Sequence, residues 1–127
     1  GLEPQQCWLQ PTVEAGRAAT AELLNQHPAD RPDALLASNG LLLLGAAQAI
    51  QSAGLQMPHD IGLAGFDNND WTTLPALDVT VIEQPTYEIG RTAAELLLQR
   101  LAEPTRPVRS VVLEGRLLAR GSTRRGG

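Results

Sequence analysis

The sequence predicts an α/β fold built on a mainly parallel sheet. Two observations carry this prediction. Short apolar runs typical of buried strands alternate with longer segments that have the apolar periodicity of helices. The stretch from Asp33 to Gly65 reads most clearly as a strand, a helix and a second strand, which is the unit that builds parallel sheets.

The first half of the chain accounts for two helices and two strands. A helix is expected over residues 12–26, because Thr12 can cap its amino end and apolar residues recur along one face. After a turn-rich break, residues 33–37 read as a short buried strand. A strongly apolar helix opens at Asn39 or Gly40 and runs to Ala53, where Gly54 suits its carboxyl end. The next strand is expected over residues 61–65.

The second half begins with a long polar loop over residues 66–78, which contains Trp71. A strand follows over residues 79–82, and a helix runs from Pro85 or Thr86 to Ala102. The buried stripe expected on this helix consists of Ile89, Ala93, Leu96, Leu97 and Leu101. Residues 110–113 and 117–119 are predicted to be two closing strands, and residues 121–127 a frayed tail.

Composition limits the possible functions. With 127 residues the chain has the size of one domain or of a piece of a larger one, and only 3% aromatic residues means an aliphatic core. The net charge of −4 argues against this segment gripping nucleic acid phosphates itself. Four late arginines fit an exposed tail better than a binding patch; they are Arg116, Arg120, Arg124 and Arg125.

The single cysteine, Cys7, excludes an internal disulfide and a cysteine-based metal cluster. No stretch approaches the ~18 apolar residues of a membrane span. The start of the sequence lacks the basic region and apolar run of a secretory signal. We therefore expect a cytoplasmic protein.

Polar side chains follow three predicted strands at the point where each strand ends. Asn39, Asp67 and Gln84 would share the carboxyl edge of a parallel sheet, where α/β sheets bind ligands. Carboxylate and amide groups suit the hydroxyls of a sugar-like ligand. Other roles remain open for each: Asn39 can cap the following helix, Asp67 can be a turn residue, and Gln84 can be a surface residue.

Catalysis finds little support in the sequence. His27 and His59 lie beside proline-type turns, and Ser38 lacks the glycine elbow of a hydrolase nucleophile. Asp67 and Asp70 could be read as half of a metal site, but a solvated loop fits them better because no further ligands cluster nearby. We expect no catalytic residue, no metal and no cofactor, and therefore not an enzyme.

Six segments in this order and spacing resemble the lac-repressor/galactose-repressor (LacI/GalR) family of transcriptional regulators. The match extends from about Thr12 to Thr123, over most of the chain. The segments are residues 32–39 (PDALLASN), 44–50 (LGAAQAI), 54–68 (GLQMPHDIGLAGFDN), 77–85 (LDVTVIEQP), 89–94 (IGRTAA) and 117–123 (LLARGST).

The resemblance implies part of an effector-binding domain with a periplasmic-binding-protein-like, doubly wound parallel sheet. Residues 1–84 would belong to the carboxyl-terminal lobe, and residues 85–115 would cross over to pack on the amino-terminal lobe. Residues 116–127 would be a return strand and a flexible tail. The implied partners are operator DNA, bound by a headpiece absent from these residues, and a second subunit. The alternative is a periplasmic-type sugar-binding protein of a transport system.

The family's ligand residues correspond to Asn39, Asp67 and Gln84 of this sequence. Gly40 stands where members usually carry aspartate, and Pro11 lies near the place of an aromatic ligand contact, which Trp8 could supply instead. Residues 66–72 (FDNNDWT) are similar to those of members that answer to sugar acids such as gluconate. The implied effector is a sugar, a sugar acid or a sugar phosphate.

Trp71 can be read in two ways from its own setting, as a platform for a sugar ring or as an anchor of a subunit interface. The resemblance favours the interface, because in this family the second helix and the loop after the aspartate form the dimer face. It implies that Trp71, Leu44 and Leu74 lie at that face.

Overall fold

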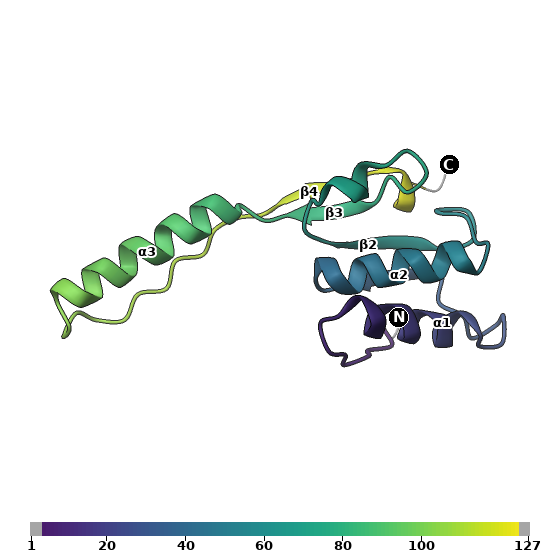
Figure 1. The fold of residues 1–127 in the computed structure, drawn as a ribbon, viewed down its shortest axis with the longest axis horizontal. Coiled ribbons are helices and arrows are strands. Elements are labelled where there is room, and N and C mark those ends of the chain that lie inside the picture. Colours follow the sequence, from purple (N-terminus) through teal and green to yellow (C-terminus); the bar gives the residue numbers. More distant parts are fainter. Residues whose placement is uncertain (1–3, 125–127) are drawn as a thin grey trace.

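The fold is organised around a four-stranded sheet in the order β1-β2-β3-β4 (Figure 1). The structure, a computed structural model, describes residues 4–124. β1, β2 and β3 are parallel, whereas β4 pairs antiparallel with β3. This confirms the predicted α/β fold with a mainly parallel sheet. The strands are β1 (Ala34–Ala37), β2 (Gly62–Phe66), β3 (Thr80–Glu83) and β4 (Arg116–Leu118).

Three α-helices and two short 3-10 helices connect the strands. They are α1 (Val13–Leu24), α2 (Gly40–Ser52), α3 (Thr86–Ala102), η1 (Asp70–Thr73) and η2 (Gly121–Thr123). The predicted caps are confirmed. Thr12 Oγ1 accepts the Ala15 N–H at 3.1 Å, and Asn39 Oδ1 accepts two first-turn N–H groups of α2 at 3.0 Å each. Each cap satisfies donors that a helix leaves unpaired at its amino end.

The core lies between the sheet and α2, and α1 packs on α2 (Figure 1). Because aromatic residues are scarce, aliphatic side chains fill it. Leu43 and Ile50 of α2 and Leu63 and Val81 of the sheet are fully buried. Burying a side chain of this size contributes about 1.5–3 kcal/mol, so this small cluster stabilises the whole body of the fold.

The two helices α1 and α2 cross at a pair of glycines. A Cβ on Gly16 would lie 2.6 Å from the carbonyl oxygen of Leu42, and a Cβ on Gly45 would fall on the carbonyl oxygen of Val13. Any other residue would therefore push the helix backbones apart. The absence of side chains at these two positions allows α1 to press α2 against the sheet.

Residues 85–115 form a limb that projects from the sheet (Figure 1). It consists of α3 and the extended segment that returns to β4. No residue of α3 is buried, and Leu97 and Leu101 are 59% and 69% exposed. The predicted buried stripe is therefore wrong for the described residues, because α3 extends away from the four-stranded sheet.

The strand predicted over residues 110–113 is also wrong. That segment is extended, but it runs alongside α3 and no strand of the described chain pairs with it. Its β-branched residues have a high propensity for strands, but a strand also requires a neighbouring strand to which it can hydrogen bond. The closing strand at Arg116–Leu118 does form, because β3 is available beside it.

The segment after β4 is ordered by specific contacts. Ser122 is 1% exposed, its hydroxyl donates to the Leu63 carbonyl at 2.5 Å, and the Thr80 N–H donates to it at 2.8 Å. The prediction of a frayed tail is therefore wrong for Gly121–Thr123, since a buried serine locks this turn onto β2 and β3. Residues 125–127 of the predicted tail, with Arg125, lie outside the described residues.

Among residues 4–124, no helix has the length and apolar character needed to cross a membrane.

The glycine crossing generates a testable prediction. Gly45→Ala should lower the free energy of unfolding by about 1–3 kcal/mol, because the added methyl group meets backbone that cannot move aside. Thermal unfolding monitored by circular dichroism measures the change.

The control is Gly90→Ala in the interior of α3, where an added methyl meets nothing within 4 Å. Gly90→Ala should be neutral or stabilising, by up to about 1 kcal/mol from helix propensity. Equal effects of the two variants would contradict the close helix crossing.

Candidate functional site

The carboxyl edge of the sheet brings Asn39, Asp67 and Gln84 to one place, as the sequence predicts. Asp67 directly follows β2, Gln84 directly follows β3, and Asn39 lies between β1 and α2. Gln84 Nε2 donates to Asp67 Oδ1 at 2.7 Å. The Gly40 N–H donates to Asp67 Oδ2 at 3.1 Å. The Asp67 carboxylate therefore connects the ends of all three parallel strands.

Asp67 has a left-handed backbone conformation, with a φ angle of 75°. This region is unfavourable for residues other than glycine, although aspartate and asparagine tolerate it better than most. Its own N–H donates to the Ile82 carbonyl at 3.1 Å, which continues the pairing of β2 with β3 by one residue. The sharp turn after this bond directs the carboxylate back toward the start of α2.

Gly40 makes the approach of Asp67 to α2 possible. A Cβ at residue 40 would lie 3.2 Å from Asp67 Oδ2 and 2.8 Å from Asn69 Nδ2. With no side chain there, the carboxylate reaches a free N–H at the amino end of a helix, where the helix dipole favours negative charge. Glycine at position 40 thus has a local structural reason.

Asn39 caps α2, which is one of the two roles that the sequence allowed for it. Its Oδ1 is occupied by the N–H groups of Leu41 and Leu42, so only its Nδ2 remains to donate to a ligand. Asn39 does not line the cleft next to Asp67. Its contact with a ligand stays a prediction.

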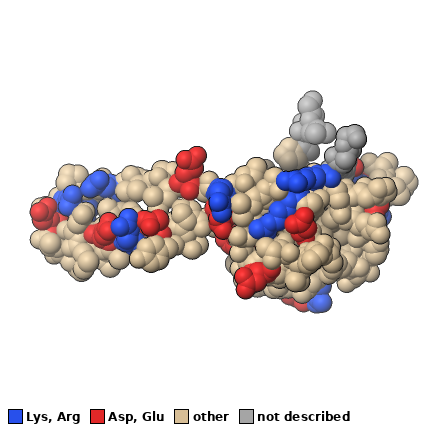
Figure 2. All heavy atoms as spheres, turned by 90° about the horizontal axis from the view of Figure 1, so that it is seen from above, with Lys and Arg blue, Asp and Glu red and all other residues tan. Residues whose placement is uncertain are grey.

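A cleft of about 570 Å³ opens beside Asp67, between the sheet and the base of the limb. Polar and charged side chains dominate its walls, and Figure 2 shows acidic and basic side chains side by side at the narrow waist between limb and body. The lining residues are Asp67, Asn68, Asn69, Glu83, Gln84, Pro85, Thr86, Tyr87, Glu88, Glu114 and Arg116. Such a wall offers many acceptors and donors to a polar ligand.

A hydrogen-bonded group beside Asp67 was not predicted from the sequence. Asn68 Nδ2 donates to Glu83 Oε1 at 2.8 Å, and Arg116 Nη2 donates to Glu83 Oε2 at 2.8 Å. The hydrogen bond from Asn68, and second that from Arg116, hold the pKa of Glu83 below its ordinary value. Glu83 precedes Gln84 and Asn68 follows Asp67 in the sequence. Their position next to predicted ligand residues is the feature of the sequence that could have identified them.

Trp8, the predicted aromatic ligand contact, is 93% exposed and does not line the cleft. In Figure 1 the segment that precedes α1 lies at the same end of the sheet as the base of the limb. The segment therefore lies at the end of the sheet that carries the cleft, while the indole itself is almost fully exposed. A ligand contact from Trp8 stays a prediction.

The residues predicted for a dimer face lie on α2 and on the loop around η1. Trp71 is half-buried and packs against the core of its own chain. Leu44 is half-buried, whereas Leu74 is 51% exposed. Trp71 therefore already has an intramolecular role, and Leu74 is the more accessible of the two loop residues.

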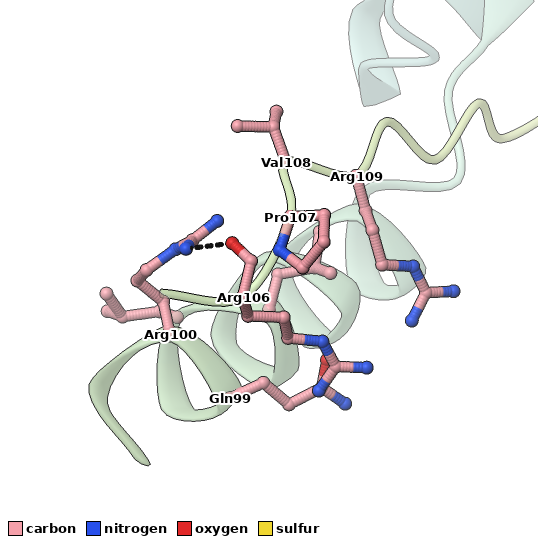
Figure 3. Close-up of a pocket in the computed structure, with 8 residues that line it drawn as sticks. Gln99, Arg100, Arg106, Pro107, Val108 and Arg109 are labelled. Carbon is pink, nitrogen blue, oxygen red and sulfur yellow. Dashed lines mark hydrogen bonds between the residues drawn. The ribbon is translucent and has the colours of Figure 1, made fainter. Parts of the chain in front are cut away.

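A second, smaller cleft of about 210 Å³ lies between α3 and the segment that follows it (Figure 3). Arg100 Nη1 donates to the carbonyl oxygens of Pro104, at 2.9 Å, and of Arg106. These bonds connect the last turn of α3 to the backbone of the segment that follows it. We assign this cleft a structural role at the tip of the limb, away from the carboxyl edge of the sheet.

Comparison with known proteins places this geometry in a family. A family model described as a periplasmic binding protein-like domain matches residues 1–123. The chain is similar to the HTH-type transcriptional regulator KdgR of Bacillus subtilis, with 36% identity over 104 residues, or 80% of this chain and 31% of KdgR. The HTH-type transcriptional repressor CytR of Escherichia coli is 37% identical over 113 residues, or 89% of this chain and 33% of CytR.

Solved structures show the same relationship. A LacI family transcriptional regulator from Enterococcus faecium, with bound ribose, has a TM-score of 0.75 and 32% identity, and the match covers 91% of this chain and 41% of that one. The chain spans about a third of the length of its curated relatives, 31% and 33% for the two above. It belongs to the periplasmic binding protein-like domain family and, within it, to the LacI/GalR family of transcriptional regulators.

Proposed function

We propose that this chain is part of the effector-binding domain of a LacI-type transcriptional regulator, and that a sugar-like effector binds at Asp67. The carboxylate of Asp67 carries the proposal, because it stands at the carboxyl edge of the sheet inside a polar cleft. Each of its oxygens accepts one protein hydrogen bond and keeps a second lone pair for a ligand hydroxyl. The ribose bound to the Enterococcus faecium relative supports a carbohydrate effector.

The proposed mechanism is allosteric. An effector that contacts Asp67 and the far wall of the cleft binds one arrangement of the two lobes better than the other, and this difference in affinity shifts their equilibrium. Operator DNA is bound by a part of the protein outside these 127 residues. The named relatives are transcriptional regulators, which supports a regulatory role over that of a transport binding protein or an enzyme. The proposed location of such a regulator is the cytoplasm.

The limb has a place in the same proposal. Its apolar side chains form the surface on which a second lobe of the same protein packs, so that the cleft lies between two lobes. High exposure of these residues supports this arrangement. They include Leu97, Leu98, Leu101, Val108 and Val112, which are 59%, 66%, 69%, 91% and 91% exposed.

Ligand binding tests the role of Asp67. In the longest natural polypeptide that contains this chain, the melting temperature should rise with one class among neutral sugars, sugar acids and sugar phosphates, because ligands that bind the native state stabilise it. Asp67→Asn keeps a residue that tolerates the left-handed backbone but removes the charge. It should weaken binding roughly tenfold or more, as expected for loss of hydrogen bonds to a charged group.

Asp70→Asn is the matched control, since Asp70 is exposed at the start of η1 and does not line the cleft. It should keep the full melting shift. An Asp67→Asn protein that binds the same compound with unchanged affinity would remove Asp67 from the site.

The dimer face is tested at Leu74 rather than at Trp71, because Trp71 also supports the core of its own chain. Leu74→Arg should convert dimers to monomers in analytical ultracentrifugation, since a buried unpaired charge is unfavourable at an interface. Gln56→Arg, on the exposed connector after α2, introduces the same charge elsewhere and should leave the dimer intact. Dimers that persist in Leu74→Arg would place the interface on another face.

A further inference from the structure

Arg120 makes more contacts with the loop after β2 than any role in a charged tail would require. Its Nη1 donates to Thr72 Oγ1 at 2.9 Å and to the Val79 carbonyl at 3.0 Å. Its Nη2 donates to Asn68 Oδ1 at 2.6 Å. A guanidinium is planar and rigid, so these three bonds fix the relative positions of their acceptors.

The base of the Arg120 side chain is itself anchored. The Arg120 N–H donates to Thr80 Oγ1 at 2.8 Å, and the Arg120 carbonyl lies 3.2 Å from the same hydroxyl, which also bonds Thr123 Oγ1. Arg120 is therefore held against β3 at its backbone and reaches the loop with its side chain. The loop between β2 and β3 thus gains a fixed point from a residue that lies outside the loop, after β4.

Asn68 connects Arg120 to Asp67, because it is bonded to Arg120 and directly follows Asp67 in the chain. Arg120 holds the Oδ1 of Asn68, and Glu83 accepts from its Nδ2 at 2.8 Å, so both ends of the amide are occupied. Fixing Asn68 in this way also fixes the peptide that joins it to Asp67. The left-handed backbone of Asp67 is unfavourable in isolation and persists only where its surroundings hold it.

We infer that Arg120 is a positioning residue for the effector site, which acts through Asn68 to keep Asp67 in the conformation that presents its carboxylate to the cleft. The inference rests on the proposed function for its biological meaning. Arg116 is a weaker candidate, because its bond to Glu83 is an exposed ion pair, with 72% of the arginine side chain accessible.

Amide hydrogen exchange followed by mass spectrometry, without any ligand, tests the inference in the longest natural polypeptide that contains this chain. Arg120→Met keeps the aliphatic stem and removes every donor. Amides of residues 67–74 and of Gly40 should exchange about tenfold faster, as expected when hydrogen bonds from a charged group are lost. Amides of β2 should keep their rates, because local opening and global unfolding affect different amides.

Two further variants complete the test. Arg124→Met removes a guanidinium that donates to the Ala119 carbonyl at 3.0 Å and, among the described residues, bonds no atom of the loop, so it should leave the loop amides unchanged. Asn68→Ala changes an exposed residue, so it keeps the inference testable if Arg120→Met does not fold, and it should accelerate the same loop amides.

Two results would overturn the inference. One is unchanged exchange of the loop amides in Asn68→Ala or Arg120→Met. The other is equal acceleration of the loop and of β2 in Arg120→Met, which would make Arg120 a general stabiliser of the fold. Because no ligand is present, neither result depends on whether sugars bind at Asp67.

Discussion

The arrangement of the carboxyl edge of the sheet depends on two hydrogen bonds to the carboxylate of Asp67. One oxygen accepts from the backbone at the start of α2, and the other accepts from the side chain that leads into the limb. The same group thus joins the helix that forms the core to the connection that carries α3. An effector that bonds the remaining lone pairs of this carboxylate, as proposed above, would contact the one group that joins both connections, which gives a short physical route from ligand contact to a change in shape.

Several features could be predicted because their causes are local. Thr12 and Asn39 precede apolar helical patterns, and each caps its helix as expected. Asp67 and Gln84 follow strand-like runs, and parallel strands must end at one edge. In these cases the residue type and its position relative to one element were sufficient.

Other features could not be predicted because they depend on distant parts of the chain. Apolar periodicity correctly indicates that α3 is amphipathic, but it does not say whether a partner for its apolar face is present. Residues 110–113 fail to form a strand for the same reason. Arg120 lies 52 residues from Asn68, and no short-range pattern distinguishes an arginine that reaches back to a loop from one in a solvated tail. The reason for glycine at position 40 is a contact between distant parts of the chain, because a Cβ there would lie 3.2 Å from Asp67 Oδ2.

The register of β3 with β4 has a topological consequence. Glu83 lies opposite Arg116, so the chain leaves the sheet and returns to it at one rung of the ladder. The limb is therefore an insertion at the tip of the β-hairpin formed by β3 and β4. The hydrogen bonds between these two strands do not depend on the residues that are inserted. Residues 89–113, which do not line the cleft, can therefore differ in sequence without altering the edge that holds Asp67. One sheet can in this way serve proteins whose remaining parts differ.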